Sequence, residues 1–463
     1  MKKTFQQLQW IFAIFAFALA SACAESQSHP QTDEQWTALF DGKSLDGWKQ
    51  LGGEAKFTVE DGEIVGTTVA NTPNSFIFTE KEYGDFILEL DIKIDDSANN
   101  SGVQTRSHYD PDGNDGKGKV FGRQVELDPS SRRWTGGIYD EGRRDWLYPL
   151  SLHPGAQDQF KLNDYNHFKI ECIGNEMKTW VNGKATAYVV DTLDSTGFIA
   201  LQVHSTDAAH TGKKVHFKNI KINTNPTPSA FEKGIYVVNL QPNSLSAYEK
   251  ENGWNLLFDG KSAENWKSAK DETFPEKGWK IENGTLTVLS SEGKESANGG
   301  DIVTKKEYSA FDLSFFFKLT PGANSGVKYF VTLNEETKGS AIGLEYQVLD
   351  DERHPDAKMG KNGNRTLASL YDLIRADKQK RFVRPPGEWN RGRIVVYPDN
   401  RVEHYLNGVK VLEYVRGSKA YRDLVAESKY KIWPNFGEAK QGHILLQDHG
   451  NEVSYKNIKI REL

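Results

Sequence analysis

The chain has 463 residues, a formal net charge of −6 and 11% aromatic residues. This length suggests two or three domains, and a slightly acidic chain without a basic stripe is unlike a nucleic-acid-binding protein. We therefore expect no nucleic acid among its partners. The aromatic and glycine content is that of a soluble globular protein with large cores.

The first residues have the pattern of an export signal. Two lysines precede an apolar run over 10–20 that is short for a bilayer span, and small residues follow it. Cys23 directly after Ala-Ser-Ala resembles a bacterial lipoprotein site, whose cysteine becomes the lipidated N-terminus. Plain cleavage before Cys23 is the alternative. We expect a signal peptide over 1–22 and a polar tether over 23–35, with the exported protein in the periplasm or at the outer membrane or cell surface. The lipid at Cys23 would then be its membrane contact.

The rest of the chain is a tandem duplication. The stretch 36–48, Trp-Thr-Ala-Leu-Phe-Asp-Gly-Lys-Ser-Leu-Asp-Gly-Trp, returns over 254–266 as Trp-Asn-Leu-Leu-Phe-Asp-Gly-Lys-Ser-Ala-Glu-Asn-Trp. A repeat of this length is far too long for a solenoid. We therefore expect one domain over 36–224, a linker over 225–253 and a second copy over 254–463. The tryptophans of this motif are expected to clasp the first strand and turn.

Each copy reads as a series of short strands. The stretch 86–94, Phe-Ile-Leu-Glu-Leu-Asp-Ile-Lys-Ile, alternates apolar and polar residues, and Asp-Gly or Asn-Gly pairs mark hairpins. Because helical periodicity is nearly missing, the pattern predicts an all-β antiparallel sandwich for each copy. Short helices are expected only at 246–252 and within 419–429. Cys172 lies in a strand-like run and is expected to be a core thiol without a disulfide.

Two matching strands organise the candidate site. They are 122–128, Gly-Arg-Gln-Val-Glu-Leu-Asp, and 343–350, Gly-Leu-Glu-Tyr-Gln-Val-Leu-Asp. Every second residue is apolar, so the residues between them share the opposite face. A half-exposed strand with its polar face in water is the alternative. The polar face carries one carboxylate and one amide in each copy, in swapped order: Gln124, Glu126, Glu345 and Gln347.

Other repeated polar residues are expected to gather around these strands. Arg106 supplies a cation in the first copy and Lys328 in the second, a Gln-x-His motif follows late in each copy, and a Tyr-Asp-x-x-Arg segment offers a hydroxyl. The candidates in the first copy are Gln104, Arg106, Gln124, Glu126, Tyr139, Trp146, Gln202 and His204. The candidates in the second copy are Asn324, Lys328, Glu345, Gln347, Tyr371, Gln447 and His449.

Two chemistries suit such a set of residues. Paired donors and acceptors beside an aromatic wall bind sugars. A carboxylate or imidazole beside a cation can instead remove a proton next to a carbonyl and hold the developing enolate. From the residues alone both interpretations stay open.

Metal signals are weak. The stretch 110–116 resembles the start of a calcium loop, but Phe121 stands where a bidentate glutamate should close it, so an exposed turn is favoured. His354 lies among several acidic residues, which is a low-specificity pattern that favours a polar loop. No cofactor is predicted with certainty, and a divalent metal is left open.

In combination these motifs resemble the 3-keto-disaccharide hydrolase family, long known as a domain of unknown function. The resemblance covers nearly all of 36–463 in two copies. It rests on Leu-Phe-Asp-Gly-Lys-Ser, Asn-Ser-Gly-Val, Gly-x-Glu-x-Gln, Leu-Gln-Asp-His and the closing Asn-Ile-Lys-Ile. It implies a concanavalin-like (lectin/glucanase) jelly-roll sandwich in a secreted or lipid-anchored bacterial protein. Its substrates would be glycosides already oxidised at C3 by a separate oxidoreductase.

The resemblance also implies a reaction. A base removes the C2 hydrogen, a cation or metal steadies the enolate, the C1 leaving group departs by elimination, and water addition completes a net hydrolysis. Ordinary glycoside hydrolysis would need two carboxylates. A carbohydrate-binding protein or a surface assembly module is the alternative, because such sandwiches host lectins as readily as enzymes. The expected bases are Glu126 or His204 and Glu345 or His449, with Arg106 and Lys328 as electrophiles and Tyr139 and Tyr371 as acids.

Overall fold

The computed structural model describes residues 35–463 except 117 and 334–340. Residues 35–463 belong to one compact unit. The expected signal peptide, most of the tether and the lipidation site at Cys23 lie outside the described residues. Among the helices that the structure describes, none is both long and apolar enough to cross a membrane.

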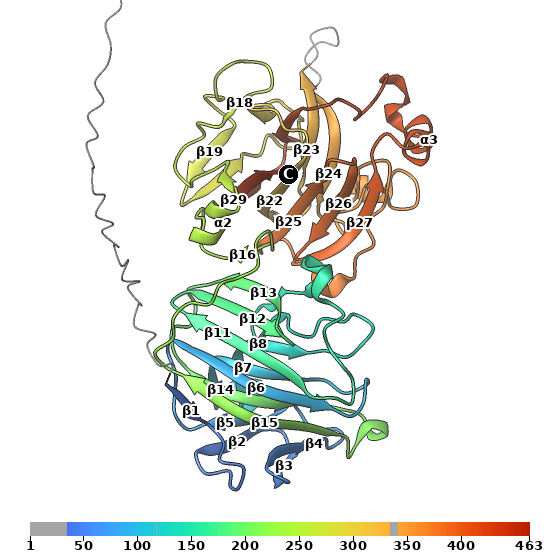
Figure 1. Cartoon of the computed structure of the whole chain (residues 1–463). Coiled ribbons are helices and arrows are strands. Elements are labelled where there is room, and N and C mark those ends of the chain that lie inside the picture. Colours follow the sequence, from blue (N-terminus) through green and yellow to red (C-terminus); the bar gives the residue numbers. More distant parts are fainter. Residues whose placement is uncertain (1–34, 117, 334–340) are drawn as a thin grey trace, which may run out of the picture. The chain divides into compact units, whose positions relative to one another are not determined.

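The first repeat is a sandwich of two sheets, coloured blue to green in Figure 1. All its strand pairs are antiparallel except β13 with β16. The larger sheet follows the order β16 (Val238–Asn239), β13 (Lys184–Val190), β12 (Glu176–Val181), β11 (Asn166–Ile173), β6 (Phe86–Ile94), β15 (Lys214–Asn223), β4 (Glu63–Thr67) and β3 (Lys56–Glu60), with β1 (Trp36–Ala38) on β15. The smaller sheet follows the order β10 (Asp145–Tyr148), β9 (Ile138–Glu141), β8 (Lys119–Leu127), β7 (Ser101–Asp110), β14 (Phe198–Val203), β5 (Ser75–Thr79) and β2 (Trp48–Gly52).

The second repeat has the same architecture, in yellow to red in Figure 1. Its larger sheet follows the order β19 (Trp279–Glu282), β20 (Thr285–Val288), β29 (Val453–Glu462), β22 (Phe311–Leu319), β25 (Asn390–Val396), β26 (Arg401–Leu406) and β27 (Val409–Val415), with β17 (Asn255–Leu256) on β29. Its smaller sheet follows the order β18 (Trp266–Ser268), β21 (Ile302–Thr304), β28 (His443–Leu446), β23 (Asn324–Leu333) and β24 (Ala341–Leu349). The prediction of two all-β sandwiches is therefore confirmed.

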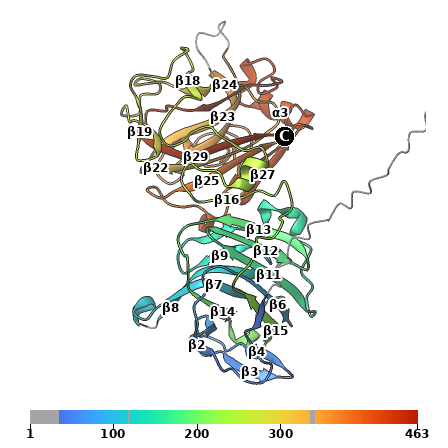
Figure 2. The ribbon, with the colours of Figure 1, turned by 60° about the vertical axis from the view of Figure 1, so that its left-hand side comes forward.

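The alternation of β6 explains how the first core forms. Leu88, Leu90, Ile92 and Ile94 are fully buried between the sheets, while Glu89, Asp91 and Lys93 stay partly exposed on the other face. Figure 2 shows β11, β12 and β13 beside one another in the same sheet. Burial of apolar faces of this size is the main stabilising contribution to each sandwich.

The second tryptophan of each repeated motif clasps the start of its domain, as predicted for these two residues. The indole nitrogen of Trp48 donates to the carbonyl of Leu39 at 2.8 Å. The indole nitrogen of Trp266 donates to the carbonyl of Leu257 at 2.7 Å. Both rings are buried, so each hydrogen bond ties the motif to the next strand in a dry environment.

Helices are few and short, and both expected ones are present. Helix α2 (Ala247–Glu251) begins after Ser246, whose side chain and that of Glu249 form a capping box. Helix α3 (Lys419–Glu427) begins after Ser418. The other helical segments within the described residues are α1 (Gly113–Gly116), η1 (Leu150–Leu152), η2 (Pro154–Ala156), η3 (Ala208–His210), η5 (Pro355–Lys358), η6 (Lys380–Phe382) and η7 (Lys429–Ile432).

Three motif-bearing strands lie next to one another in each smaller sheet. Their order is β8-β7-β14 in the first repeat and β24-β23-β28 in the second. Because neighbouring strands align their side chains face by face, this order brings the carboxylate–amide pair close to the residues of the Asn-Ser-Gly and Leu-Gln motifs.

Candidate active site

A cavity of about 610 Å³ opens on the smaller sheet of the second repeat. All the candidates that the sequence suggested for this copy line it. They are Asn324, Lys328, Glu345, Gln347, Tyr371, Gln447 and His449. The loops add other lining groups, which include His354, Asp356, Lys429 and Trp433.

Strand register places Glu345 at the floor of this cavity. Lys328 on β23 lies directly opposite Glu345 on β24. Gly326 lies diagonally from Glu345, and a Cβ built on this glycine would stand 2.4 Å from Oε1 of Glu345. The glycine of the Asn-Ser-Gly motif therefore leaves the space into which the carboxyl group folds.

Glu345 is a buried acid among basic groups. Only 5% of its surface is exposed, and this burial raises its pKa, while Lys328, Lys429 and His449 act in the opposite direction. Burial lowers the pKa of Lys429, against the attraction of Glu345. An ionised carboxylate in such surroundings is a stronger base than one in water, because water does not stabilise its charge.

A hydroxyl and two imidazoles complete the second-repeat site. The hydroxyl of Tyr371 donates to Oδ2 of Asp356 at 2.8 Å, and burial and this carboxylate raise the tyrosine pKa, so Tyr371 keeps its proton. Arg365 holds Asp356 from the other side at 2.9 Å. The rings of His354 and His449 lie 5.8 Å apart, centroid to centroid, at an interplanar angle of 85°.

The loop residues were missed by the sequence patterns. Asp356 lies in the short turn η5 and Lys429 begins the short turn η7, where no strand alternation says which way a side chain points. His354 was favoured as part of a polar loop, and its Nδ1 accepts from the backbone nitrogen of Asp356 at 3.2 Å. The one usable signal for Lys429 was its place at the end of an insertion that the first copy lacks, because insertions often form the rim of a site.

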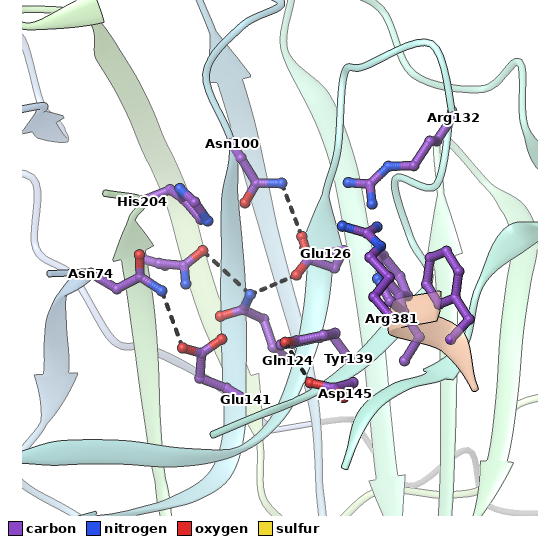
Figure 3. Close-up of a pocket in the computed structure, with 13 residues that line it drawn as sticks. Asn74, Asn100, Gln124, Glu126, Arg132, Tyr139, Glu141, Asp145, His204 and Arg381 are labelled. Carbon is purple, nitrogen blue, oxygen red and sulfur yellow. Dashed lines mark hydrogen bonds between the residues drawn. The ribbon is translucent and has the colours of Figure 1, made fainter. Parts of the chain in front are cut away.

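The first repeat has its own cavity of about 290 Å³ at the equivalent place (Figure 3). Six of the first-copy candidates line it: Gln124, Glu126, Tyr139, Trp146, Gln202 and His204. Residues that sequence reasoning did not select also line it: Asn74, Asn100, Arg132, Glu141, Asp145, Arg381 and Phe382.

Arg106 does not face this cavity, which contradicts the expected electrophilic role. A β-bulge between Thr105 and His108 breaks the alternation of β7, and Arg106 itself has a positive φ of 46°. Its buried guanidinium instead donates to the carbonyls of Gly84 at 2.8 Å and Gly174 at 2.7 Å. It is a structural clamp.

The residue that matches Lys328 is therefore Gln104 and not Arg106. Gln104 lies opposite Gln124 just as Lys328 lies opposite Glu345. Gln104 is fully buried, and its Nε2 donates to Oε1 of Gln124 at 2.8 Å. It supports the lining of the cavity from behind and is not among the residues that form it.

Glu126 is the buried carboxyl group of the first cavity. It accepts from Gln124 Nε2 at 2.9 Å and from Asn100 Nδ2 at 3.2 Å. Burial raises the pKa of Glu126 to about 8, in spite of these two hydrogen bonds, and the charges of Glu141 and Asp128 add to the rise. Glu126 is thus largely protonated at neutral pH.

Metal ligands do not converge in either cavity. Throughout 35–463, leaving aside the undescribed positions, no group of three or more His, Cys, Asp and Glu side chains is arranged to hold a metal ion. Lys328, Lys429 and His449 act on Glu345 to lower its pKa, and Asp301 acts to raise it.

Fold and cavities together define a protein of two β-sandwich domains, each with a polar, carboxyl-bearing cavity on its smaller sheet. The family model of the 3-keto-alpha-glucoside-1,2-lyase-like domain matches residues 35–223 and 253–461. A 3-keto-disaccharide hydrolase of Bacteroides thetaiotaomicron is 36% identical over 241 residues, which are 48% of this chain and 82% of the relative. The chain belongs to this family and carries two copies of its domain, so the resemblance inferred from the motifs is confirmed.

Solved structures also align with one domain's length of the chain. A protein of Parabacteroides distasonis, assigned provisionally to the glycosyl hydrolases, has 30% identity and a TM-score of 0.42, over 48% of this chain and 100% of its own. The carbohydrate-binding module CBM66 of Bacillus subtilis has 21% identity and a TM-score of 0.27, over 38% of this chain and 94% of its own.

Proposed function

We propose that the chain is a glycoside-cleaving enzyme that acts on 3-keto-glycosides, and that the second repeat carries the reaction. The observation that supports this most directly is the buried Glu345 with Lys328 opposite it and Lys429 nearby, in a cavity of about 610 Å³. The name of the 36% identical relative, a 3-keto-disaccharide hydrolase, favours the same substrate class.

The residues of this cavity suit an elimination followed by hydration. Glu345 takes the hydrogen from C2 of the sugar, and the electron pair moves into an enolate whose oxygen is the former C3 ketone. An ammonium group of Lys328 or Lys429 stabilises that oxygen. The C1–O bond then breaks, and Tyr371 donates a proton to the leaving oxygen. This step restores the C3 ketone and leaves a double bond between C1 and C2. Addition of water across that double bond, with the hydroxyl on C1 and the hydrogen on C2, completes a net hydrolysis.

Glu345 is favoured over His449 as the base, although both were expected candidates. A general base works best when its pKa lies near the operating pH, and burial shifts Glu345 in that direction. Its position opposite Lys328 also places the cation beside the carboxylate that removes the proton.

The test is release of the leaving group from a chromogenic 3-keto-glucoside by the full chain. Glu345→Gln keeps the size of the side chain and removes the base, so kcat should fall at least about 100-fold. Glu413→Gln, at an exposed residue that pairs with Lys410 on the same repeat, is the matched control and should leave kcat unchanged. Wild-type turnover by Glu345→Gln would refute the assignment.

A non-catalytic carbohydrate-binding protein is the second candidate function. The family description favours the enzyme, but the polar cavities themselves fit a sugar in either case. Saturable sugar binding without any turnover, with an affinity that Glu345→Gln leaves intact, would select the binding protein.

The oxidised substrate requires a preceding reaction. We propose that a separate oxidoreductase, which converts the C3 hydroxyl of a glycoside to a ketone, supplies it. The purified chain should release no aglycone from the unoxidised glucoside, and adding a sugar 3-dehydrogenase with its electron acceptor should restore release. Equal rates on both glycosides would refute this order.

We also propose that the protein is exported and lipid-anchored, on the pattern of residues 1–23. Cys23→Ser should move the protein from the membrane fraction to the soluble fraction of the cell envelope. An unchanged distribution would leave plain signal cleavage as the better account.

A further inference from the structure

The cavity of the first repeat has a wall from the second repeat. Arg381 and Phe382, in the turn η6, line it together with residues of β8, β9, β10 and β14. Figure 3 shows Arg381 beside Arg132 and Glu126 at one side of the cavity. Residues more than 170 positions apart in the sequence therefore share one site.

Contacts on both sides hold this turn in place. On the second repeat, Asn407 Nδ2 donates to the carbonyl of Phe382 at 2.6 Å. On the first repeat, the ring of Phe382 lies 5.8 Å from that of Trp134, and Arg384 Nη1 donates to Oδ2 of Asp145 at 2.8 Å. The wall that η6 forms is thus fastened to both domains.

Asp145 and Trp134, which contact this turn, also contact residues that line the cavity. Asp145, which binds Arg384, also accepts from the hydroxyl of Tyr139 at 3.0 Å. Arg132 lies over the rings of Trp134 and Trp146 at 5.0 and 5.7 Å. The cavity therefore has a fixed aromatic side and a fixed polar side.

Buried polar atoms in this lining have no partner within the described residues. They are Oδ1 of Asn100, an acceptor, and Nε2 of Gln202, a donor. Buried polar atoms are nearly always hydrogen-bonded, so the pair indicates a ligand with both donors and acceptors. Sugar hydroxyl groups both donate and accept, and the rings of Trp146 and Tyr139 suit the apolar face of a pyranose.

The first cavity has no lysine among its lining residues, and its cations are the guanidinium groups of Arg132 and Arg381. Gln104 takes the place of Lys328 and is not exposed to the cavity. The ionised neighbours that act on Glu126 are the acids Glu141 and Asp128, whereas those of Glu345 are mostly basic. A buried carboxyl group with acidic neighbours keeps its proton, so it donates a hydrogen bond to a hydroxyl more readily than it removes a carbon-bound proton.

We propose that the first repeat binds an unoxidised α-glucoside without cleaving it, and that Arg381 and Phe382 of the second repeat form part of that binding site. The family description names 3-keto-alpha-glucosides, and the ligand proposed here has the same alpha linkage but an unoxidised C3. This site goes beyond the proposed catalytic function and does not depend on it, because it takes sugars whose C3 still carries a hydroxyl.

Calorimetric titration of the full chain with maltose and with trehalose tests the site. The Glu345→Gln background excludes turnover, so only binding is measured. We expect one saturable site for at least one of these disaccharides. Phe382→Ala and Arg381→Ala should each weaken it about tenfold, through loss of stacking surface and of a hydrogen-bond donor.

Controls separate this site from the second cavity. Lys380→Ala changes an exposed neighbour in the same turn that pairs with Glu352 and does not line the first cavity, so the affinity should stay at the wild-type value. Trp433→Ala changes the lining of the second cavity and should also leave it unchanged. The proposal is overturned if neither sugar binds at millimolar concentration. It is also overturned if Trp433→Ala weakens binding while the Arg381 and Phe382 variants do not.

Discussion

At the scale of single residues, two buried glutamates in equivalent cavities differ because of their neighbours. Glu126 has amide donors and acidic neighbours, whereas Glu345 has Lys328, Lys429 and His449. Burial raises the pKa of both carboxyl groups, but the basic neighbours of Glu345 oppose the rise, whereas the acidic neighbours of Glu126 add to it. The two copies thus differ both in the order of carboxylate and amide along the strand and in the sign of the charges around the carboxyl group.

The Glu126→Gln variant tests the raised pKa of Glu126, because this pKa makes the free energy of unfolding depend on pH. The pKa of Glu126 is raised from 4.5 to about 8 in the folded protein. The folded state therefore holds the proton longer than the unfolded chain, and the free energy of unfolding of the wild type should fall as pH rises from about 4.5 to 8.

The Glu126→Gln variant does not titrate at this position, so it should lose less stability over the same interval. Urea unfolding at several pH values in this range measures both profiles. Parallel profiles for the two proteins would contradict a raised pKa.

At the scale of elements, strand pairing turns a short motif into a site. The Asn-Ser-Gly motif lies on β23 beside β24, and its glycine leaves room for the carboxyl group of Glu345. The first domain has the same arrangement with an amide in place of the carboxyl group, because a Cβ on Gly102 would stand 2.5 Å from Cδ of Gln124. Both glycines thus serve the side chain on the neighbouring strand.

A methyl group at position 326 should therefore damage the reaction more than the fold. Gly326→Ala pushes Glu345 from its place, and kcat should fall about 10- to 100-fold, since small displacements of a reacting group are costly. Gly155→Ala is the control, because its Cβ would meet no atom closer than 3.8 Å. Full activity of Gly326→Ala, measured with the same chromogenic 3-keto-glucoside, would show that Glu345 needs no such space.

At the scale of the whole molecule, the repeats are joined by more than the linker. Besides the pair of Arg384 and Asp145, Ser151 Oγ donates to the carbonyl of Gly408 at 2.7 Å. Arg391 Nη2 donates to the carbonyl of Leu147 at 2.7 Å. These contacts bring a loop of one domain to the cavity of the other, so the duplication yields a site that neither copy contains alone.

Arg384 offers a test of this coupling because it does not line the first cavity itself. Arg384→Lys keeps the charge but loses the fork that also reaches the carbonyl of Arg144. Maltose or trehalose binding, measured by the same titration, should weaken about threefold to tenfold, while turnover of the 3-keto-glucoside stays unchanged. Unaltered sugar affinity would mean that η6 holds its position without this contact.

The sequence by itself determined the duplication, the all-β class and the family, because these follow from local periodicity and repeated motifs. All the residues that the sequence analysis selected for the second repeat line the second cavity. For Glu345 and Gln347 the reason is the uninterrupted alternation of β24, which puts both side chains on one face.

The tertiary structure decided what local patterns cannot express. A bulge turned Arg106 away from the predicted face, and the short turns η5 and η7 brought Asp356 and Lys429 to the second cavity. The turn with Arg381 reached the first cavity from the other domain. In each case the position of the side chain depends on contacts between residues far apart in the chain, and no pattern along a single strand records them.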